Sequence, residues 1–311
     1  MNYMTNKIVA IQADHPSKLN PVTDTSIFLA NEIQNKNYKI FYYDPKNLSI
    51  INSKVIASGF FIKFNYDQKK KFKILRKQKL DLTKCKFILI RQDPPFNLEY
   101  ISTTYILDTI KKKVRIINDP TSIRNISEKL YSSKYQKFMP KTIFTQDMSE
   151  IKKFFDKNEE VILKPINGYG GNDIHLLKKF DKKFIKKFIK KHDHIICQKY
   201  LPKISIGDKR VFLINSKVVG AISRIPKSGS FLSNMSKGAK PTKTRLSKIE
   251  NKISKIVAKN LKKENIFFAG IDFIDQKLNG DINVTSPTGL KTLFDLSGKN
   301  LAKTFWKELK V

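Results

Sequence analysis

Cysteine and long apolar runs are both scarce in this 311-residue sequence, which contains only two cysteines. Cys85 and Cys197 each lie in an apolar run, a setting typical of buried free thiols, so we predict no disulfide framework and a reducing cytoplasm. No apolar run approaches the roughly 18 residues that a membrane span requires, and residues 1–7 lack the apolar segment of a signal peptide. We therefore expect a soluble protein without a membrane partner.

Histidine is also rare, with four residues at His15, His175, His192 and His194. None of them has a Cys or His partner at the spacing of a zinc site, which argues against structural zinc.

Acidic residues are few: 27 Asp and Glu stand against 61 Lys and Arg, a formal net charge of +34. Such a charge is typical of proteins that bind nucleic acids or anionic membranes. The lysines are nevertheless spread along the whole chain among Asn, Ile and Phe, as the codon bias of an AT-rich genome produces. We favour this compositional origin and predict no nucleic-acid partner; a basic nucleic-acid-binding protein is the alternative from another functional class.

The first 120 residues alternate between strand and helix signals. Apolar runs at 7–12, 39–44 and 86–91 predict strands, Asp24 is placed to cap a helix that runs to about Asn35, and residues 99–112 and 114–118 predict a helix and a strand. The Lys-rich region from 47 to 82 gives no clear assignment. Arg91 and Asp14 follow predicted strands, and open α/β sheets bind ligands at the carboxyl ends of their strands, so both should face a substrate.

A Gly-rich hairpin is predicted in the middle of the chain. The apolar run 161–165 carries Lys164 and leads to Gly168, Gly170 and Gly171, after which residues 173–177 predict a return strand. A lysine can contact a nucleotide phosphate, and glycines let backbone N–H groups approach its oxygens. The spacing is that of neither a P-loop nor a dinucleotide fingerprint. We interpret the segment as a flap over ATP; the alternative is a flexible hairpin without a ligand.

The segments on either side of this hairpin predict a small α+β lobe between residues 142 and 191, preceded by a helix from Ser122 to Gln136. Phe180, Phe184 and Phe188 recur at helical spacing in a Lys-rich segment of that lobe. Such a basic amphipathic helix could bind a membrane. We favour a helix that packs its phenylalanines inward and exposes its lysines.

The last third of the chain begins at His194. A β-hairpin is predicted over 207–215 and 217–226, turned at Asn215-Ser216, and a small-residue loop follows at 229–238. Ser247 and Glu250 predict a capping box at the start of a helix. The apolar stripe of this helix would consist of Ile249, Ile253, Val257 and Leu261. Residues 297–309 predict a final helix.

Acidic side chains gather on one predicted hairpin near the end of the chain. Residues 267–275 and 281–285 predict two antiparallel strands turned at Asn279-Gly280. Asp281 and Asn283 are two residues apart and share a face of their strand, which Asp272 on the neighbouring strand can join. Three oxygen ligands without His or Cys suit Mg²⁺ that is shared with water and nucleotide phosphates. The alternative is that these residues share a surface by chance and bind no metal.

Short motifs along nearly the whole chain resemble those of the bacterial glutathione synthetases, a family with the ATP-grasp fold. They are residues 91–96 (RQDPPF), 104–107 (TYIL), 128–130 (EKL), 162–165 (ILKP), 200–202 (YLP), 207–210 (GDKR), 224–226 (RIP) and 282–288 (INVTSPT). The resemblance implies an α/β fold with α+β lobes. It comprises an N-terminal open α/β substrate domain (1–120), a central ATP-grasp lobe with the flap (121–193) and a C-terminal lobe with the metal site (194–311).

The resemblance also implies roles for matching residues. Those expected to bind ATP are Lys129, Lys164, Gly168, Tyr169, Gly170, Gly171, Gln198, Lys199, Tyr200, Leu201 and Asp208. Arg210 and Arg224 would be catalytic and face the transferred phosphoryl group. The peptide substrate would contact Arg91, Asn234, Gly238, Ser286 and Thr288, and the metal would be held by Asp272, Asp281 and Asn283.

The implied reaction joins glycine to γ-glutamylcysteine through an acyl phosphate, with ATP as co-substrate and Mg²⁺ as the cofactor, or Mn²⁺ in its place. The implied protein is a homo-oligomeric cytoplasmic enzyme, a dimer or a tetramer. A rival within the fold is a ligase for another amino acid and carboxylate, and a second rival is a catalytically dead homologue that binds ATP structurally.

Three positions depart from the family's pattern. Asp281 stands where the family usually has Glu, Leu232 where it has Arg, and Ala239 where it has Gly. Because Leu232 removes a partner for a carboxylate, we expect a raised KM for one carboxylate substrate and retained binding of ATP and Mg²⁺.

Overall fold

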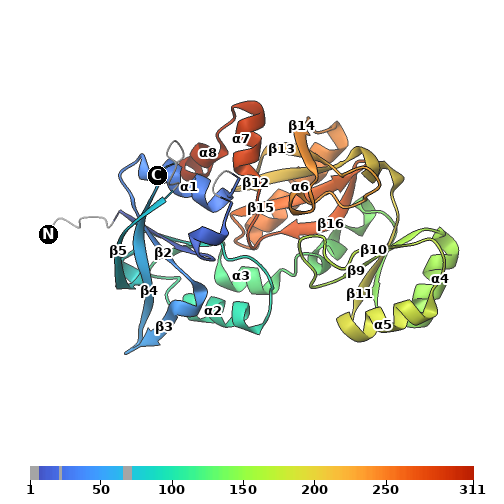
Figure 1. Ribbon diagram of the computed structural model, residues 1–311, viewed down its shortest axis with the longest axis horizontal. Helices are drawn as coiled ribbons and strands as arrows, with labels where there is room; N and C mark the ends of the chain where they lie inside the picture. Colours follow the sequence, from blue (N-terminus) through green and yellow to red (C-terminus); the bar gives the residue numbers. More distant parts are fainter. Residues whose placement is uncertain (1–6, 21–22, 66–71) are drawn as a thin grey trace.

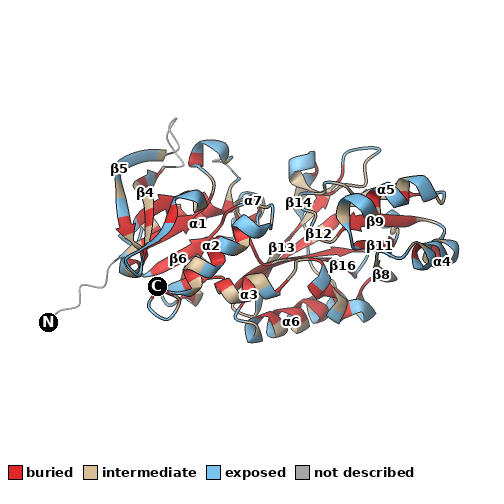
Figure 2. Ribbon diagram, turned by 90° about the horizontal axis from the view of Figure 1, so that it is seen from below, coloured by how far each residue is buried: buried red, intermediate tan, exposed pale blue. Residues whose placement is uncertain are grey.

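The computed structural model describes residues 7–20, 23–65 and 72–311, which form three lobes in a row (Figure 1). The N-terminal domain lies at one end, the central lobe at the other, and the C-terminal lobe between them. Within the described residues the three lobes contain sheets of seven, four and five strands. Buried residues follow the strands in every lobe (Figure 2). The structure therefore has the predicted mixed α/β architecture.

The N-terminal sheet is centred on short apolar strands that are buried on both faces. Its strand β1 (Ile8–Gln12) pairs in parallel with β2 (Lys39–Tyr43) and β6 (Phe87–Ile90), and β7 (Arg115–Ile117) pairs in parallel with β6. Continuous apolar runs are typical of such doubly buried parallel strands, so all four were predictable. The helices of this domain are α1 (Thr25–Gln34), α2 (Leu98–Asp108) and α3 (Pro120–Asn125).

The region from 47 to 82, which gave no assignment, is an antiparallel extension of this sheet. It consists of β3 (Leu48–Ile51), β4 (Lys54–Phe64) and β5 (Phe72–Asp81). The central strand β4 pairs with β2 and β3 along one edge and with β5 along the other. Most residues of β5 are exposed, so lysines on both faces hide the alternation that usually predicts a strand. Residues 66–71 lie outside the described part of the chain.

The single helix predicted from Ser122 to Gln136 is wrong. Helix α3 ends at Asn125, and a 3₁₀ segment, η4 (Leu130–Phe138), begins five residues later. Between them the carbonyl oxygen of Glu128 accepts a hydrogen bond from the Ile282 N–H at 3.0 Å. A continuous helix would use this carbonyl internally. The break therefore attaches Glu128 and Lys129 to the C-terminal sheet.

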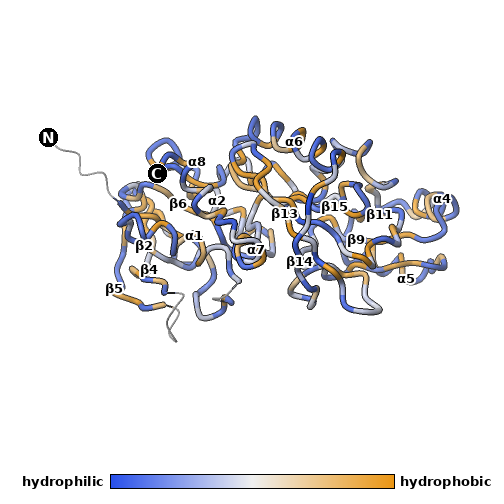
Figure 3. The backbone as a smooth tube through the Cα atoms, turned by 90° about the horizontal axis from the view of Figure 1, so that it is seen from above, coloured by the Kyte–Doolittle hydropathy of each residue, from blue (hydrophilic) through white to orange (hydrophobic). Residues whose placement is uncertain are grey.

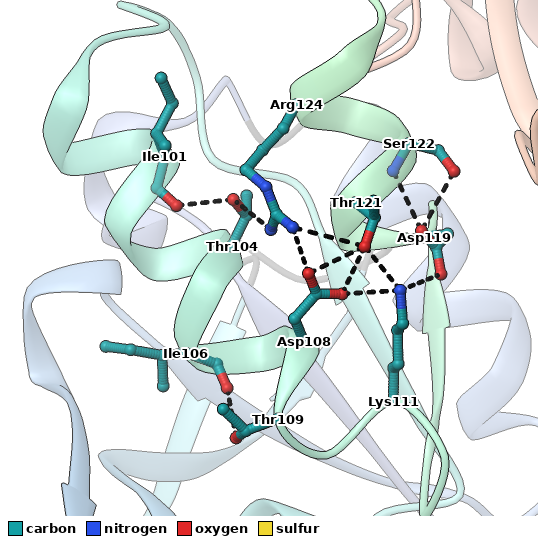
Figure 4. A network of polar contacts seen from close by, with 10 residues as sticks. All are labelled: Ile101, Thr104, Ile106, Asp108, Thr109, Lys111, Asp119, Thr121, Ser122 and Arg124. Atoms are coloured by element: carbon teal, nitrogen blue, oxygen red, sulfur yellow. Dashed lines mark hydrogen bonds and ion pairs between the residues drawn. The ribbon is translucent and has the colours of Figure 1, made fainter.

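A polar network fixes α3 against α2 just before this break (Figure 4). The Asp108 carboxylate accepts hydrogen bonds from the Thr121 hydroxyl at 2.8 Å and from Arg124. Lys111 lies 2.9 Å from Asp108 and 3.5 Å from Asp119, and so joins the end of α2 to the start of α3. The network sets the direction in which the chain leaves the N-terminal domain.

The central lobe is a four-stranded antiparallel sheet in the order β10-β9-β11-β8. Its strands are β8 (Thr142–Thr145), β9 (Val161–Pro165), β10 (His175–Leu177) and β11 (Ile195–Lys199). Strand β11 pairs with both β8 and β9, although the predicted boundary at residue 194 would assign it to the next lobe. We therefore propose a boundary after Lys199.

Helices α4 (Met148–Asn158) and α5 (Lys182–His192) lie together on the outside of this lobe (Figure 1). Phe188 is buried in the lobe's core, and Phe180 and Phe184 pack against it partly buried. The predicted inward-facing phenylalanine stripe is thus confirmed. No helix within the described residues is long and apolar enough to cross a membrane.

The C-terminal sheet has the order β14-β13-β12-β15-β16. Its strands are β12 (Asp208–Ile214), β13 (Lys217–Ile225), β14 (Lys240–Lys243), β15 (Phe268–Ile274) and β16 (Lys277–Asn283). The predicted hairpin at Asn215-Ser216 joins β12 to β13, with φ values of 47° and 64° at the turn. Helices α7 (Leu290–Ser297) and α8 (Leu301–Glu308) follow, whereas one helix was predicted over 297–309.

Helix α6 (Lys248–Lys263) has the predicted capping box and one face turned to the sheet. Ile253, Val257 and Leu261 are buried, but Ile249 is 54 % exposed. The inner position of the first turn belongs instead to Glu250, whose carboxylate accepts from the Ser247 N–H at 2.7 Å and pairs with Lys209 at 2.9 Å. Hydrophobic and hydrophilic residues alternate along α6 accordingly (Figure 3).

The predicted turn at Asn279-Gly280 is also wrong. Strands β15 and β16 are joined at Asp275-Gln276, with φ values of 46° and 62°. Asn279 and Gly280 lie inside β16, where the pairing is irregular and Gly280 has φ of 93°. The Asn-Gly signal marks a position that needs positive φ, and here that position is a bulge.

Asn118 connects the N-terminal domain to the C-terminal lobe at a buried position. Its amide nitrogen donates to the carbonyls of Phe268 and Val284 at 2.7 and 2.6 Å. Its amide oxygen accepts from the N–H groups of Phe267 and Phe268 at 2.9 and 2.8 Å. One side chain thereby satisfies four backbone groups.

We predict that Asn118→Ala destabilises the protein by roughly 3 kcal/mol or more, because it leaves buried backbone donors and acceptors without partners. Chemical denaturation should show a lower midpoint. Asn47→Ala, at an exposed position, is the control and should change stability by less than about 0.5 kcal/mol. Equal stability of the two variants would contradict the anchoring role of Asn118.

Candidate functional site

One cavity lies between the central and C-terminal lobes, with the Gly-rich hairpin and the acidic hairpin on its walls. It brings together most of the residues singled out from the sequence. They are Lys129, Lys164, Gly168, Tyr169, Gly170, Gly171, Gln198, Lys199, Tyr200, Leu201, Asp208, Arg210, Arg224, Asn234, Asp272 and Asp281. Because these residues come from distant parts of the sequence, their convergence supports a common ligand.

Two carboxylates and two guanidinium groups alternate across the floor of the cavity. Asp208 on β12 lies opposite Arg224 on β13, and Arg210 lies opposite Asp272 on β15. The Arg224 Nε atom is 2.8 Å from Asp208 Oδ1, and its Nη2 atom is 2.9 Å from Asp272 Oδ2. Arg210 Nη2 donates to the same Asp272 oxygen at 2.7 Å. We call this row, Asp208–Arg224–Asp272–Arg210, the charge chain.

The charge chain shifts the pKa values of its members in different directions. Burial acts to raise the pKa of Asp272, but Arg210 and Arg224 outweigh it and hold the value at about 2. Burial acts to lower the pKa of Arg224, and the carboxylates of Asp272 and Asp208 outweigh it and raise that pKa. At Asp208 burial dominates and raises the pKa, although Arg224 acts against it. Asp272 therefore keeps its charge at any physiological pH.

Two lysines, Lys129 and Lys164, also line the cavity. The Lys164 Nζ atom donates to the backbone and side-chain oxygens of Asn279 at 3.1 and 3.2 Å. Lys129 donates to the Gly168 carbonyl and lies 3.7 Å from Asp281. Burial lowers the pKa of Lys164, while Asp281 acts to raise it. The bulge at Gly280 matters here, because it presents Asn279 to Lys164.

The hairpin loop and the loop from 229 to 238 touch each other over the cavity. Gly171 has φ of 76°, and a Cβ atom there would lie 2.5 Å from the Asn234 side-chain oxygen. The Lys237 ammonium donates to the Asn172 side chain at 2.6 Å. The two loops therefore meet at one side of the cavity, where residues of both line it.

An apolar slot lies beside the segment that joins the central and C-terminal lobes. Gln198, Lys199, Tyr200 and Leu201 line it, as predicted for an adenine site, together with Ile162, Ile204 and Ile274. The three isoleucines are buried. Apolar walls of this kind suit a nucleobase. The isoleucines were missed because single apolar residues in strands usually indicate only the core.

The predicted metal ligands are only partly assembled. Asp272 and Asp281 line the cavity, whereas Asn283 lies outside its lining and its side-chain oxygen accepts from the Thr285 hydroxyl at 3.5 Å. Among the described residues no group of three or more His, Cys, Asp or Glu side chains is arranged to hold a metal. Two carboxylates nevertheless fit a hard cation such as Mg²⁺ whose other ligands are phosphate and water oxygens.

The residues predicted to contact a peptide are dispersed. Of the five, only Asn234 lines the large cavity. Arg91 and Ser286 lie at the junction of the N-terminal domain and the C-terminal lobe, where Arg91 Nη2 donates to the Pro287 carbonyl at 3.0 Å. The Arg91 Nη1 atom is buried without a hydrogen-bond partner. Thr288 is exposed, and Gly238 faces Lys227.

The polar residues at the cavity that received no role from the sequence are Glu128, Asn172, Ser233 and Asn279. The Ser233 hydroxyl donates to Asp208 at 2.6 Å. Glu128 is the clearest omission, because it lies in the EKL motif. Burial raises the pKa of Glu128 to about 7, Asp281 adds to the shift, and Lys129 opposes it.

Family models and named relatives cover nearly the whole chain. The prokaryotic glutathione synthetase ATP-grasp domain matches residues 128–298, and the N-terminal domain of the same family matches residues 8–124. A glutathione synthetase of Agrobacterium fabrum is 34 % identical over 304 residues, covering 96 % of this chain and 95 % of the relative. One of Buchnera aphidicola is 33 % identical and covers 92 % of each chain.

Solved structures with low sequence identity share the fold. D-alanyl-alanine synthetase A from Vibrio cholerae is 13 % identical, with a TM-score of 0.63 over 99 % of this chain and 98 % of that structure. The ATP-grasp ligase PsnB, in complex with a minimal precursor, is 12 % identical, with a TM-score of 0.63 over 98 % of both chains. The predicted ATP-grasp fold is confirmed.

We predict that Glu128→Gln stabilises the ligand-free protein at pH 8 more than at pH 5. The folded state raises the pKa of Glu128 from 4.5 to about 7, so the folded state is penalised once pH rises above 4.5, and the penalty is complete above 7. Glutamine removes it, a gain of roughly 1–3 kcal/mol at pH 8 and less at pH 5. Thermal unfolding at both pH values measures the difference; an equal gain at both would contradict the burial of this charge.

Proposed function

The chain belongs to the prokaryotic glutathione synthetase family and is an ATP-dependent ligase of glutathione biosynthesis, and from this premise we propose how its own residues act. In the proposed reaction the carboxylate of γ-glutamylcysteine accepts the γ-phosphoryl group of ATP. The amine of glycine then attacks the acyl phosphate, the C–N bond forms, and phosphate leaves. The products are glutathione, ADP and phosphate.

The observation that supports this assignment most is the meeting of the Gly-rich hairpin and the acidic hairpin around one cavity. Lys164 and Lys129 approach the same space as Asp272 and Asp281. Lysine ammonium groups and carboxylates around one space suit a nucleotide phosphate chain neutralised by a cation. We assign the phosphates to Lys129 and Lys164, the covering loop to residues 168–171, and the adenine to the slot at residues 198–201.

Asp272 and Asp281 are the residues that we expect to hold Mg²⁺, with Mn²⁺ as the alternative, and Asn283 joins them only if its side chain turns toward the cavity. Bound there, the cation would neutralise charge on the phosphate oxygens. The supporting feature is the donor set, oxygen atoms from two carboxylates in a protein with a large excess of positive charge.

Arg210 and Arg224 are the proposed catalytic residues. Their guanidinium groups are fixed by Asp272 and Asp208, so little reorganisation is needed when negative charge develops on the phosphoryl group and on the tetrahedral oxyanion. The contacts of Asn234 and Lys237 with the hairpin loop would keep water away from the acyl phosphate, which hydrolyses readily. No covalent nucleophile on the protein is needed.

We propose that the enzyme acts in the cytoplasm on small-molecule substrates. ATP and a free-thiol peptide are available there, and Cys85 and Cys197 are buried free thiols whose pKa values burial raises to about 12. The resemblance to the family favours a homodimer or homotetramer.

We expect Lys164→Met to lower the rate of phosphate release in the presence of ATP, γ-glutamylcysteine and glycine by roughly 10²-fold. The reason is that the γ-phosphoryl group loses a fixed positive charge. The control is Lys157→Met, at an exposed position on α4, which should retain full activity. Phosphate release that does not depend on both amino-acid substrates in the unaltered protein would contradict the proposed reaction.

Leu232 lines the cavity in a position where the family resemblance places arginine. We expect Leu232→Arg to lower the KM of one carboxylate substrate by roughly tenfold, because a guanidinium adds a charge-assisted hydrogen bond. Steady-state kinetics with each substrate varied in turn measures the change, and Leu232→Met controls for the size of the side chain. Unchanged KM values for both γ-glutamylcysteine and glycine would refute this role.

A further inference from the structure

A second, smaller chamber opens beside the large cavity, between the N-terminal domain and the hairpin loop. The two share three lining residues, Glu128, Gly168 and Tyr169. The remaining walls come from four places in the chain: Pro94, Phe96 and Tyr100; Ile126 and Ser127; Ile166 and Asn167; and Thr285. A molecule in this chamber would therefore lie next to the expected position of the nucleotide phosphates.

Of the polar side chains that line the chamber, Tyr100 and Glu128 are the two that indicate a ligand. The Tyr100 side chain is only 2 % exposed, and its hydroxyl has no hydrogen-bond partner. A buried hydroxyl without a partner is costly, which indicates that something else completes it. Glu128 is the only charged residue among the lining residues. In a chain with a net charge of +34, a chamber lined by one carboxylate and no Lys or Arg selects for a cationic group.

The chamber is narrow and otherwise largely apolar. Its volume is about 30 Å³, which is room for roughly two or three water molecules. Phe96 packs against Tyr100 with ring centroids 4.9 Å apart, and Ile126 is buried beside them. An amino group and one adjoining methylene fit this space, whereas a branched side chain does not.

We propose that this chamber is the acceptor subsite, in which the Glu128 carboxylate and the Tyr100 hydroxyl hold the amino group of a small amino acid. This inference rests on the proposed function and names the place from which the acceptor approaches the acyl phosphate. Phe96 and Ile126 limit the acceptor to glycine, because they close the space that a side chain on its α-carbon would need.

An amino acid also carries a carboxylate, which needs a cationic partner. Arg91 interacts electrostatically with Tyr100 and Asp93, and its Nη1 atom is buried without a partner. Arg91 does not line the chamber itself, but it lines an adjoining cavity that shares Thr285 with the chamber, and its Nη1 atom is an unused hydrogen-bond donor. We assign the carboxylate of the acceptor to Arg91 and its amino group to Glu128.

The chamber is tested by kinetics of Tyr100→Phe and Glu128→Gln. We expect both variants to raise the KM for glycine by about tenfold or more, because the acceptor loses hydrogen bonds. Tyr100 does not line the large cavity, so Tyr100→Phe should change the KM for ATP by less than about twofold. Tyr105→Phe is the matched control, because Tyr105 lies on the same helix, α2, and is 59 % exposed. It should leave every KM unchanged. Thermal unfolding of each variant shows that it folds.

A single-turnover experiment separates this inference from the proposed function. With ATP and γ-glutamylcysteine but no glycine, Tyr100→Phe, whose side chain does not line the large cavity, should form ADP at the rate of the unaltered enzyme. If the unaltered enzyme forms no ADP under these conditions, the proposed function fails. If ADP forms normally and the KM for glycine is unchanged in both variants, only the chamber's assignment fails. A rise in the KM for γ-glutamylcysteine alone would assign the chamber to the amino group of the peptide and overturn the inference.

The size limit gives a second, independent readout. Phe96→Leu and Ile126→Val should enlarge the chamber and raise the ratio of kcat/KM for alanine to that for glycine by about tenfold. Phe155→Leu, on α4 in the central lobe's core, is the control and should leave this ratio unchanged. Unaltered selectivity in both chamber variants would show that these walls do not choose the acceptor.

Discussion

The charge chain is the interaction on which the rest of the site depends. In a protein with so few acids, two of them lie buried and hold two arginines in fixed positions on one sheet face. Asp272 contacts both guanidinium groups, so it offsets the repulsion between the two positive charges in the cavity floor. Ion pairs of this kind cost desolvation free energy and are seldom a source of stability. Their effect here is to hold the guanidinium groups of Arg210 and Arg224 in place for the phosphoryl transfer.

The sequence predicted most of the fold because its signals were local and strong. The buried strands of the N-terminal domain are continuous apolar runs, and the capping box at Ser247 needs only four residues. Strand β5, which the sequence did not predict, carries lysines on exposed faces, so its hydrophobic alternation is lost although it pairs with β4. At the site, charged residues in motifs were found, whereas Ile204 and Ile274 were not, because an apolar ligand wall and an apolar core use the same residues.

Two of the wrong predictions fall at the site itself. The helix expected through Glu128 is broken there, and the turn expected at Gly280 is a bulge. Both irregularities present polar groups to the cavity: the first delivers Glu128 and Lys129, and the second delivers Asn279. Local sequence preference favours regular structure at such points, and tertiary contacts, such as the bond from the Ile282 N–H to the Glu128 carbonyl, override it.

The C-terminal helix α8 packs against the N-terminal domain, and this contact limits which parts of the molecule can move. Trp306 on α8 is buried against α1, where its indole N–H donates to the Leu29 carbonyl at 2.9 Å, and one hydrophobic core runs through both regions. The first and last thirds of the molecule are therefore bound into a single rigid body. Among the described residues the central lobe has a separate hydrophobic core. Two short chain segments, near residues 139–141 and 200–202, connect it to the remainder, and hydrogen bonds such as those of Lys164 and Lys237 supplement them. Nucleotide entry and release would then require the central lobe to rotate about these two connections, while the rest of the molecule stays fixed.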